Sequence, residues 1–497
     1  MAGVCLLWAG IARADVRMPG LFSDNMVLQQ GSKTAVWGWA DDGEVVTVTF
    51  RGQMVSTTAK DGQWMVTLKR LKPGGPDTMI VAGKTNSIEF KNVLVGEVWV
   101  CSGQSNMEFK MEQSTNSKPD IDSATNGLIR LFLVPRLKAL EPTNDVHAAW
   151  MECSPDVVKS FTAVGYYFGR DLQKARGVPI GLIETCWGGS PAEVWMRQEA
   201  LASNPRYQKE ILDPYPAIEK DYEEKLATYE KEKADAKAGS AAFTKRSPSA
   251  PWRPTELYNG MIAPLVHYTI AGATWYQGES NAGRAEQYRS LFADMIRNWR
   301  ADWAEGNFPF LLVQLAPFNP VKDQPGDSAW AELREAQWLA TKTLPKVGMA
   351  VITDVGNPTN IHPTQKEPVG ARLALAARGI AYGEKIVYSG PIYKSMKVKH
   401  NQATVTFDFV GHGLVAKDGP LKGFAICGED HKFVWATATI EGKGSRSRVT
   451  VSAPQVEHPV AVRYGWADCP VVNLWNEDGL PASPFRTDDF PMVTAGK

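Results

Sequence analysis

Apolar, strand-like runs alternate with helical patterns from about residue 93 to residue 383, and this alternation constrains the fold more than any other feature of the chain. The strand-like runs occupy residues 93–100, 129–134, 180–185, 272–276, 310–315 and 349–353. The clearest helical pattern is residues 285–303, where Tyr288, Leu291, Phe292, Met295 and Trp299 follow helical spacing. This alternation predicts an α/β fold, with a parallel sheet covered by helices on both faces. Ligands of such sheets bind beyond the carboxyl ends of the strands.

The segments on either side have the pattern of β structure. Residues 15–92 contain short runs such as 45–50 (VVTVTF), separated by turn signals such as Asp61-Gly62, and this predicts an N-terminal β-sandwich. Residues 385–497 return to β patterning, with strict alternation at 404–409 (TVTFDF). We therefore expect the α/β domain to span residues 93–384. A Glu-, Lys- and Ala-rich stretch at 219–237 predicts an exposed helical hairpin within an insertion at about 204–250.

The first fourteen residues predict a signal peptide. They form a short apolar run that ends in Ala12-Arg13-Ala14, an A-x-A cleavage pattern, although the usual positively charged start is missing. We therefore expect a periplasmic or secreted protein whose mature chain begins near Asp15. No later apolar run is long enough to span a bilayer. The five remaining cysteines lack CxxC spacing, which argues against a thiolate metal site.

The charge balance excludes one class of partner. Lys plus Arg equals Asp plus Glu, at 54 each, so no bulk field attracts nucleic acid or an anionic membrane. The chain also contains 17 Trp. Most of these are expected to pack in β cores, and a few are candidates for stacking on sugar rings.

Three polar motifs near predicted strands and helices point to ester hydrolysis. The run 101–108 (CSGQSNME) follows the strand at 93–100 and presents Ser105 on a tight turn. The second motif is 275–281 (WYQGESN), and the third is 360–363 (NIHP), where His362 lies on a loop ahead of a helical run. A serine needs an adjacent base to become a nucleophile, and donors must stabilise the oxyanion. Met107 replaces the last glycine of a G-x-S-x-G elbow, which disfavours an ordinary α/β-hydrolase.

These motifs resemble those of the SGNH hydrolases, specifically the sialate O-acetylesterase branch. Residues 101–108 resemble its nucleophile block, 275–281 its third block and 361–374 its last block. Residues 181–190 (GLIETCWGGS) and 257–264 (LYNGMIAP) are similar to intervening segments. The likeness covers most of residues 18–480. It implies an SGNH-type parallel sheet flanked by helices, in a flavodoxin-like three-layer arrangement.

The resemblance also implies roles for individual residues. Ser105 is the expected nucleophile and His362 the expected general base. The backbone N–H groups of Ser105 and Gly189 are the implied oxyanion donors, and Gln277 would add a side-chain amide.

The third member of a catalytic triad is left open. The broad superfamily carries an acid three residues before the histidine, and this chain has Thr359 there. Glu279 is the first candidate, because related carbohydrate esterases use the glutamate of this motif. Asp354, at the end of the preceding strand, is the second. A Ser–His dyad whose imidazole is oriented by a backbone carbonyl is the remaining alternative.

The predicted function is removal of acetyl groups from a carbohydrate, without a metal or cofactor. The resemblance favours 9-O-acetylated sialic acid, for whose carboxylate Arg284 and Arg334 are available cations. Acetylated xylan or another plant polysaccharide is the alternative substrate. A non-catalytic carbohydrate-binding protein is the alternative of another class, although the intact motifs argue against it. A lipase or peptidase ranks lower, because no apolar lid-like helix lies near Ser105.

Overall fold

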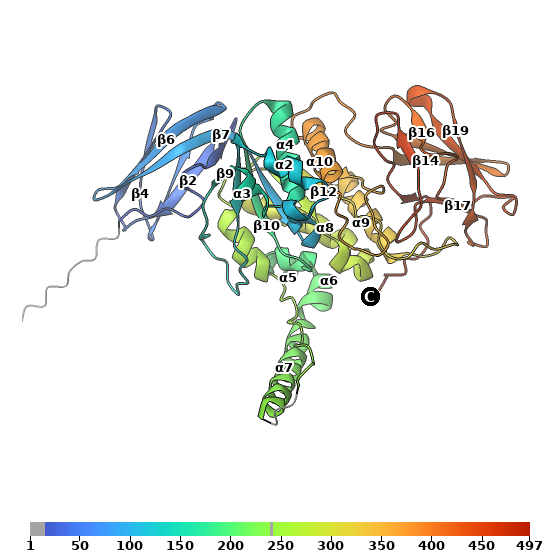
Figure 1. Ribbon diagram of the computed structural model, residues 1–497, viewed down its shortest axis with the longest axis horizontal. Coiled ribbons are helices and arrows are strands. Elements are labelled where there is room, and N and C mark those ends of the chain that lie inside the picture. Colours follow the sequence, from blue (N-terminus) through green and yellow to red (C-terminus); the bar gives the residue numbers. More distant parts are fainter. Residues whose placement is uncertain (1–14, 239–241) are drawn as a thin grey trace, which may run out of the picture.

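The computed structural model describes residues 15–238 and 242–497, so the expected signal peptide at 1–14 lies outside the described residues. An α/β region occupies the middle of the molecule (Figure 1). A β region formed by the start of the chain lies on one side of it, and a β region formed by the end of the chain lies on the other. One long helix projects away from this body.

The central sheet is mixed, with parallel strands and one antiparallel edge strand. Its strands are β7 (Ser87–Gly103), β8 (Asn126–Leu133), β9 (Met151–Cys153), β10 (Ile180–Cys186), β11 (Gly272–Tyr276), β12 (Phe310–Val313) and β13 (Val347–Ala350). Their order is β13-β12-β11-β7-β10-β8-β9, and only β9 runs antiparallel to its neighbour. The strand β10 therefore lies between β7 and β8. This differs from the 2-1-3-4-5 order of flavodoxin-like sheets, so that detail of the expected fold is not observed.

Helices cover both faces of this sheet, as the alternation predicts. The helices are α4 (Ala163–Arg176), α8 (Ala285–Trp303), α9 (Ala329–Thr343) and α10 (Glu367–Ile380). Successive side chains of β7 point to opposite faces. Val98 and Val100 belong to the core that includes α8 and α9 residues, whereas Trp99 and Cys101 belong to the core with α4 and α10 residues. Three layers result, and the helix predicted at 285–303 is confirmed as α8.

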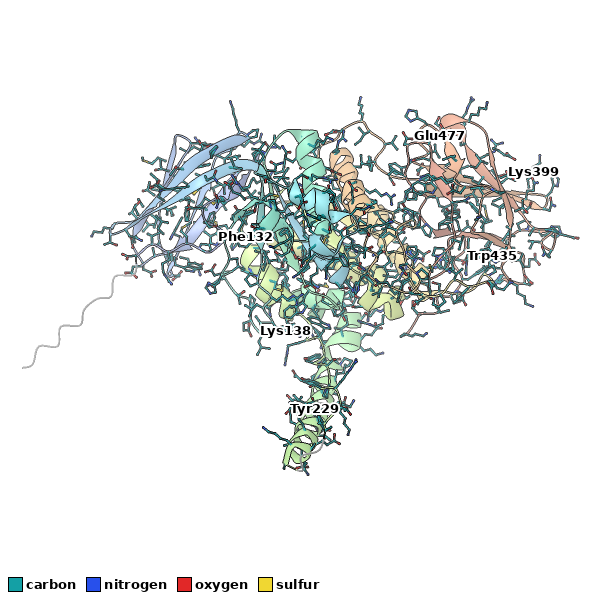
Figure 2. The ribbon with its side chains drawn as sticks, in the orientation of Figure 1. Phe132, Lys138, Tyr229, Lys399, Trp435 and Glu477 are labelled. Atoms are coloured by element: carbon teal, nitrogen blue, oxygen red, sulfur yellow. The ribbon has the colours of Figure 1, made fainter. Side chains whose placement is uncertain are left out.

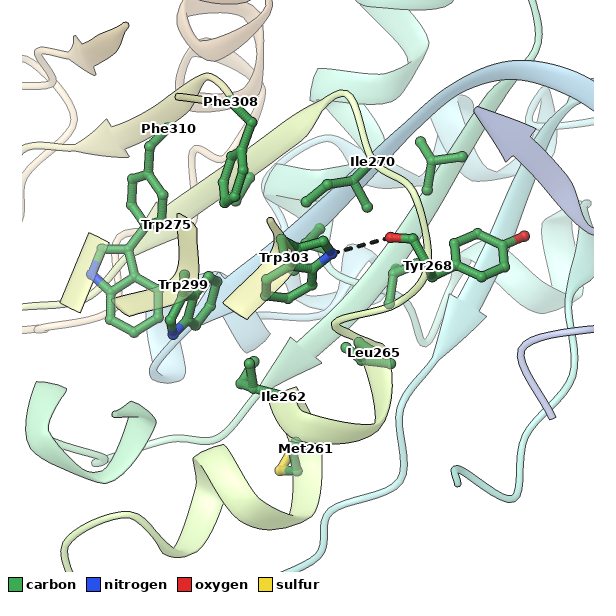
Figure 3. Packing of buried hydrophobic residues seen from close by; sticks show 14 of the residues in the cluster. Met261, Ile262, Leu265, Tyr268, Ile270, Trp275, Trp299, Trp303, Phe308 and Phe310 are labelled. Atoms are coloured by element: carbon green, nitrogen blue, oxygen red, sulfur yellow. Dashed lines mark hydrogen bonds between the residues drawn. The ribbon is translucent and has the colours of Figure 1, made fainter. Parts of the chain in front are cut away.

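Aromatic side chains fill the space between α8 and the sheet (Figure 3). The ring of Trp275 on β11 lies 5.7 Å from that of Trp299 on α8, edge to face. Trp299 in turn lies 5.8 Å from Phe310 on β12. Trp303 donates its indole N–H to the carbonyl of Tyr268 at 3.1 Å, the dashed line in Figure 3. These contacts pack β11 firmly, up to the point where its carboxyl end leads into the next segment.

The N-terminal β region is continuous with the central sheet through β7. Its other strands are β1 (Val27–Gln29), β2 (Thr34–Trp39), β3 (Val45–Phe50), β4 (Gln53–Thr58), β5 (Gln63–Leu68) and β6 (Gly74–Ala82). The first part of β7 pairs with β6 and β1, and its last part pairs with β10 and β11. The boundary expected between residues 92 and 93 therefore falls inside a single strand.

The C-terminal β region has its own buried core. Its strands are β14 (Ile392–Lys399), β15 (Gln402–Asp408), β16 (Leu414–Ala416), β17 (Phe424–Cys427), β18 (Val434–Trp435), β19 (Thr437–Glu441), β20 (Arg448–Ser452), β21 (Ala461–Tyr464), β22 (Leu474–Asn476) and β23 (Phe485–Arg486). Two four-stranded sheets, β14-β15-β20-β19 and β18-β17-β21-β23, contribute residues to one hydrophobic cluster. The two sheets therefore pack around a core that is separate from those of the central sheet.

The charged insertion forms an exposed arm. The helix α5 (Gln198–Ala202) precedes it, and the insertion itself contains α6 (Pro205–Tyr207) and the long α7 (Tyr215–Ala238), none of whose described residues is buried. Figure 2 shows Tyr229 on α7, away from the body of the molecule. The ring of Tyr229 lies 5.2 Å from that of Phe243 in the returning chain. Residues 242–253 return without helix, so the expected hairpin has one helical leg.

Three short helices complete the central region: α1 (Ser105–Glu108), α2 (Ser117–Asp122) and α3 (Pro155–Val158). No helix within the described ranges has both the length and the apolar character needed to cross a membrane. The five cysteines after residue 15 are all buried and unpaired with one another. They therefore serve as small core residues rather than as disulfides.

Candidate active site

Ser105 lies where three parallel strands end together. In the sheet register, Gly103 at the end of β7 is opposite both Cys186 of β10 and Tyr276 of β11. The chain then turns sharply, and Gln104 donates its N–H to the carbonyl of Tyr276 at 3.0 Å. Gly103 has φ of +140°, and an added Cβ would lie 2.2 Å from that same carbonyl oxygen. Only glycine fits there, and the turn leaves Ser105 half-buried at the start of α1.

His362 reaches Ser105 from a distant segment of the chain. It lies on the loop between β13 and α10, and its Nε2 is 2.8 Å from Oγ of Ser105. Its backbone N–H donates to Oδ1 of Asn360 at 2.9 Å. Burial lowers the pKa of His362 below its usual value, and the positive charge of Lys366 lowers it further. The neutral imidazole that can accept the serine proton is therefore favoured near neutral pH.

The structure does not bring Asp354 to the imidazole. Both of its carboxylate oxygens accept from the guanidinium of Arg372, at 2.6 and 2.8 Å. Within residues 15–238 and 242–497, no side chain or carbonyl forms a hydrogen bond with Nδ1 of His362. The prediction of Asp354 as the orienting acid is therefore corrected: Asp354 pairs with Arg372 of α10 instead.

Glu279 likewise forms no hydrogen bond with the imidazole of His362. It contacts Asn106, the residue after Ser105, instead. Its Oε1 accepts from Nδ2 of Asn106 at 2.6 Å, and Oε2 is buried without a hydrogen-bond partner among the described residues. Burial raises the pKa of the Glu279 carboxyl. The single oxygen of the Asn106 amide, Oδ1, accepts from Nζ of the fully buried Lys366 at 2.6 Å. An amide thus bridges a buried carboxyl and a buried amine next to the nucleophile.

Two backbone N–H groups are available for an oxyanion. Across the described part of the chain, neither Ser105 nor Gly189 uses its N–H in a hydrogen bond. Gly189 has φ of +77°, and its carbonyl accepts from the hydroxyl of Ser280 at 2.9 Å. The N–H of Gly188 is instead taken by Oε2 of Glu108 at 2.7 Å. The predicted pair of backbone donors is therefore free to serve.

Gln277 does not supply the expected side-chain amide. It is fully buried, and its Nε2 donates to the carbonyl of Ser190 at 3.2 Å and to Oδ1 of Asn281 at 2.6 Å. Its Oε1 accepts from the hydroxyl of Tyr288 at 2.9 Å. Both amide donors are thus occupied, and Gln277 is corrected to a structural residue beneath the site.

The two arginines predicted to bind the substrate carboxylate also contact other groups of the protein. Arg334 is fully buried and donates to the carbonyls of Leu315, Ala316, Ala467 and Asp468 at 2.7–3.1 Å. Its prediction as a substrate-binding residue is therefore corrected to a tie between the sheet and the C-terminal region. Arg284 is 30% exposed and pairs with Glu193 at 2.6 Å and with Gln287 at 2.7 Å.

An aromatic and cationic surface, which the sequence reasoning missed, borders the nucleophile. Trp187, directly after β10, and Trp252, at the end of the insertion, pack edge to face with centroids 5.6 Å apart; we call them the tryptophan pair. Lys138 lies 4.2 Å from the ring centre of Trp252, and Arg136 lies 5.4 Å from that of Trp187. Trp187 lies within the motif at 181–190, but nothing in the sequence pattern around Trp252 marks it.

This surface is connected to Ser105 by short contacts. Arg136 forms an ion pair with Glu108, which accepts the N–H of Gly188. A Cβ added to Gly188 would lie 3.2 Å from Cβ of Ser105. Ser105, His362, two free backbone N–H groups and the tryptophan pair therefore converge at one edge of the sheet, an arrangement suited to acyl transfer.

Several known proteins are similar to this chain over nearly its whole length. A crystal structure of a carbohydrate acetylesterase from Xanthomonas citri superposes with a TM-score of 0.83 and 39% identity, over 96% of this chain and 100% of that chain. Human sialate O-acetylesterase is 30% identical over 97% of this chain and 94% of the human protein. The Mus musculus sialate O-acetylesterase is also 30% identical, over 97% of this chain and 96% of its own.

The model of a protein family matches residues 95–226 and 236–378, which is more than half of the chain. That family is described as carbohydrate esterase, sialic acid-specific acetylesterase. Its match covers most of the central sheet, the insertion except residues 227–235, and the loop that carries His362. Together with the relatives, it shows that the protein is an esterase and belongs to the sialic acid-specific acetylesterase family of carbohydrate esterases.

Proposed function

We propose that this protein removes O-acetyl groups from a carbohydrate through an acetyl-serine intermediate on Ser105, with His362 as general base. The observation that carries the proposal is the distance of 2.8 Å between Nε2 of His362 and Oγ of Ser105. That contact joins two segments 257 positions apart in the chain. The depressed pKa of His362 supports the same role, because a base must be unprotonated to work.

The proposed reaction has two steps. His362 takes the Ser105 proton while Oγ attacks the acetyl carbonyl, and the resulting oxyanion accepts the N–H groups of Ser105 and Gly189. The C–O bond to the sugar then breaks, and the imidazolium returns its proton to the leaving alkoxide. Water attacks the acetyl-serine by the reverse proton route, which releases acetate and regenerates the hydroxyl.

For the substrate we favour acetylated sialic acid. The human and mouse relatives are sialate O-acetylesterases. Arg136 and Lys138 support this choice: each pairs with a glutamate, Glu108 or Glu256, but their side chains are 50% and 36% exposed beside the tryptophan pair, where a guanidinium or ammonium can also bind a sugar carboxylate. An acetylated xylan or other plant polysaccharide is the second candidate, since the tryptophan pair would also receive a neutral sugar ring. Acetate release measured in parallel on 9-O-acetyl sialic acid and on acetylated xylan separates the two.

Replacement of the nucleophile tests the mechanism. We expect Ser105→Ala to lower turnover of 4-nitrophenyl acetate by at least about 10³-fold, because no other group can form the acyl-enzyme. Ser160→Ala, which removes an exposed hydroxyl, is the matched control and keeps wild-type turnover. A Ser105→Ala variant that turns over like the wild type would refute the proposed mechanism.

A non-catalytic sugar-binding protein remains the alternative of another class. A fluorophosphonate probe labels only a serine that an adjacent base has activated. We expect labelling of the wild type at Ser105, located by peptide mass spectrometry, and an unlabelled wild-type protein would favour the alternative.

We also propose that the protein is exported to the periplasm or secreted. The A-x-A pattern at Ala12-Arg13-Ala14 supports this location. Amino-terminal sequencing of the protein isolated from its own cells tests it, and a mature chain that retains residues 1–14 would contradict it.

A further inference from the structure

The imidazole of His362 lacks the carboxylate partner that usually orients a catalytic histidine, so another contact must hold it. Nδ1 of His362 has no hydrogen bond to any residue within the described ranges. The loop that carries the ring is instead fixed through its backbone. The carbonyl of Ile361, directly before His362, accepts from Nδ2 of Asn106 at 3.0 Å. Asn106 directly follows Ser105, so one side chain connects the nucleophile turn to the base loop.

Asn106 is itself held in one orientation by opposite partners. The residue is 1% exposed. Its Oδ1 accepts from Lys366 at 2.6 Å, and its Nδ2 also donates to Oε1 of Glu279 at 2.6 Å. An ammonium can only donate and a carboxylate can only accept, so a flipped amide would lose both contacts. The two buried groups therefore fix which end of the amide faces Ile361.

We propose that Asn106 is a positioning residue: its side chain holds the backbone of Ile361, and thereby the imidazole of His362, in place beside the nucleophile. This inference rests on the proposed Ser105 mechanism and extends it. Lys366 and Glu279 act through Asn106, and neither touches the serine hydroxyl. The bridge takes over the orienting task that a carboxylate at Nδ1 performs in a triad.

Lys366 adds an electrostatic role to this bridge. Its Nζ lies 4.7 Å from the ring centre of Phe109 and 5.2 Å from that of Tyr276. Burial lowers the pKa of Lys366 to about 7, and the nearby Glu279 opposes that change. Where His362 titrates, below its usual value of 6.5, Lys366 is charged and disfavours the imidazolium. The lysine thus helps to keep the base unprotonated.

Asn106→Asp tests the positioning role. Aspartate can still accept from Lys366, but it has no donor for Glu279 or for the Ile361 carbonyl. We expect kcat for acetate release to fall roughly 10²-fold, with KM within about twofold of the wild type, because a small misplacement of the base slows the chemical step. Thr115→Val is the matched control. It removes a hydroxyl contact of 2.6 Å with Thr364 on the same loop and is expected to keep kcat within about twofold.

The double variant Asn106→Asp/Glu279→Gln separates positioning from folding. The new glutamine amide can donate to the new aspartate, so the contact returns with its donor and acceptor exchanged and the net charge unchanged. The carbonyl of Ile361 still lacks a donor. We expect the melting temperature to recover toward that of the wild type while kcat stays low. Recovery of both together, or wild-type kcat in Asn106→Asp, would overturn the positioning role.

Lys366→Met gives a readout that a purely structural role would not move. Loss of its positive charge removes one cause of the depressed His362 pKa, so that pKa rises. The acid limb of the kcat/KM profile, which reports the protonation of His362, should move to higher pH. An unmoved acid limb would overturn the electrostatic role of Lys366.

Ser105→Ala, assayed alongside, keeps the two proposals distinguishable. Wild-type turnover in that variant would overturn the acyl-enzyme mechanism itself. An inactive Ser105→Ala together with wild-type kcat in Asn106→Asp would overturn the positioning role alone.

Discussion

Gly188 packs closely against Glu108 and Ser105. This residue places its N–H on Glu108 and its Cα beside Ser105, and it leaves the neighbouring N–H of Gly189 free. A side chain at position 188 would press against Ser105. The glycine therefore leaves space beside the Ser105 side chain.

Gly188→Ala is predicted to slow the reaction without unfolding the protein. The added Cβ would lie 3.0 Å from Oε2 of Glu108 and 3.2 Å from Cβ of Ser105, so both must shift. A displacement of this kind costs roughly 10²-fold in kcat. Gly127→Ala, at an exposed glycine whose added Cβ meets nothing within 4 Å, is the matched control. Equal kinetics in the two variants, measured on a chromogenic acetate ester, would contradict this view of Gly188.

The sequence pointed to Ser105 and His362 as the proposed reacting pair but not to the contacts that surround them. Ser105 and His362 were found because acyl transfer needs those residue types after strands and before helices, and the structure brings them together. Glu279, Gln277 and Arg334 were assigned as though their polar groups faced the substrate. Burial and hydrogen bonding decide instead which way a polar side chain points, and those depend on segments far away in the chain.

Arg334 of the helix α9 contacts both the central sheet and the C-terminal β region. Arg334 donates to carbonyls at the end of β12 and to carbonyls of Ala467 and Asp468. Burial lowers the pKa of Arg334 to about 10, which leaves it charged at neutral pH. Charged donors to buried carbonyls form strong contacts, so this helix fixes how the two regions meet.

Arg334→Met is therefore expected to lower stability rather than substrate affinity. Four carbonyl oxygens would lose their donor, at a cost of about 3–5 kcal/mol. Calorimetry should show a clearly lower melting temperature, whereas Lys342→Met, at an exposed position on the same helix, should not. A raised KM in Arg334→Met at an unchanged melting temperature would instead indicate contact with substrate.

The elements were predicted more accurately than their arrangement. The helix α8 matches residues 285–303 because its apolar spacing continues without interruption, and β10 and β11 match because apolar runs end at polar motifs. Strand order was not predictable, because it depends on which face each connecting helix covers. Periodicity contains no information about the position of β10 between β7 and β8.

At the scale of the whole molecule, α7 stands apart from the three regions that pack together. Its contacts are made mainly with its own returning chain, such as the ring pair of Tyr229 and Phe243 and the ion pair of Lys245 with Glu232. An element with no buried residues contributes little to the cores of the protein. Its base, where Arg253 pairs with Glu219, leads directly to Trp252.

Shortening the arm should therefore be tolerated. Replacement of residues 230–242 by a four-residue Gly/Ser linker keeps Tyr229 and Phe243, whose rings lie 5.2 Å apart, and preserves the base. We expect the melting temperature to change by less than about 2 °C and turnover of a small acetate ester to remain at the wild-type level. A marked drop in either quantity would show that the distal arm supports the fold or the site.

The single strand β7 has a consequence for engineering. Val95 pairs with Gly74 of the N-terminal β region, and two residues later Glu97 pairs with Ile180 of the central sheet. No linker exists between them at which a cut would spare both sides. A chimera that exchanges the N-terminal β region at the expected boundary between residues 92 and 93 would cut through β7, the strand that leads to Ser105. Domain grafting should therefore keep β7 intact and place its junctions outside Ser87–Gly103.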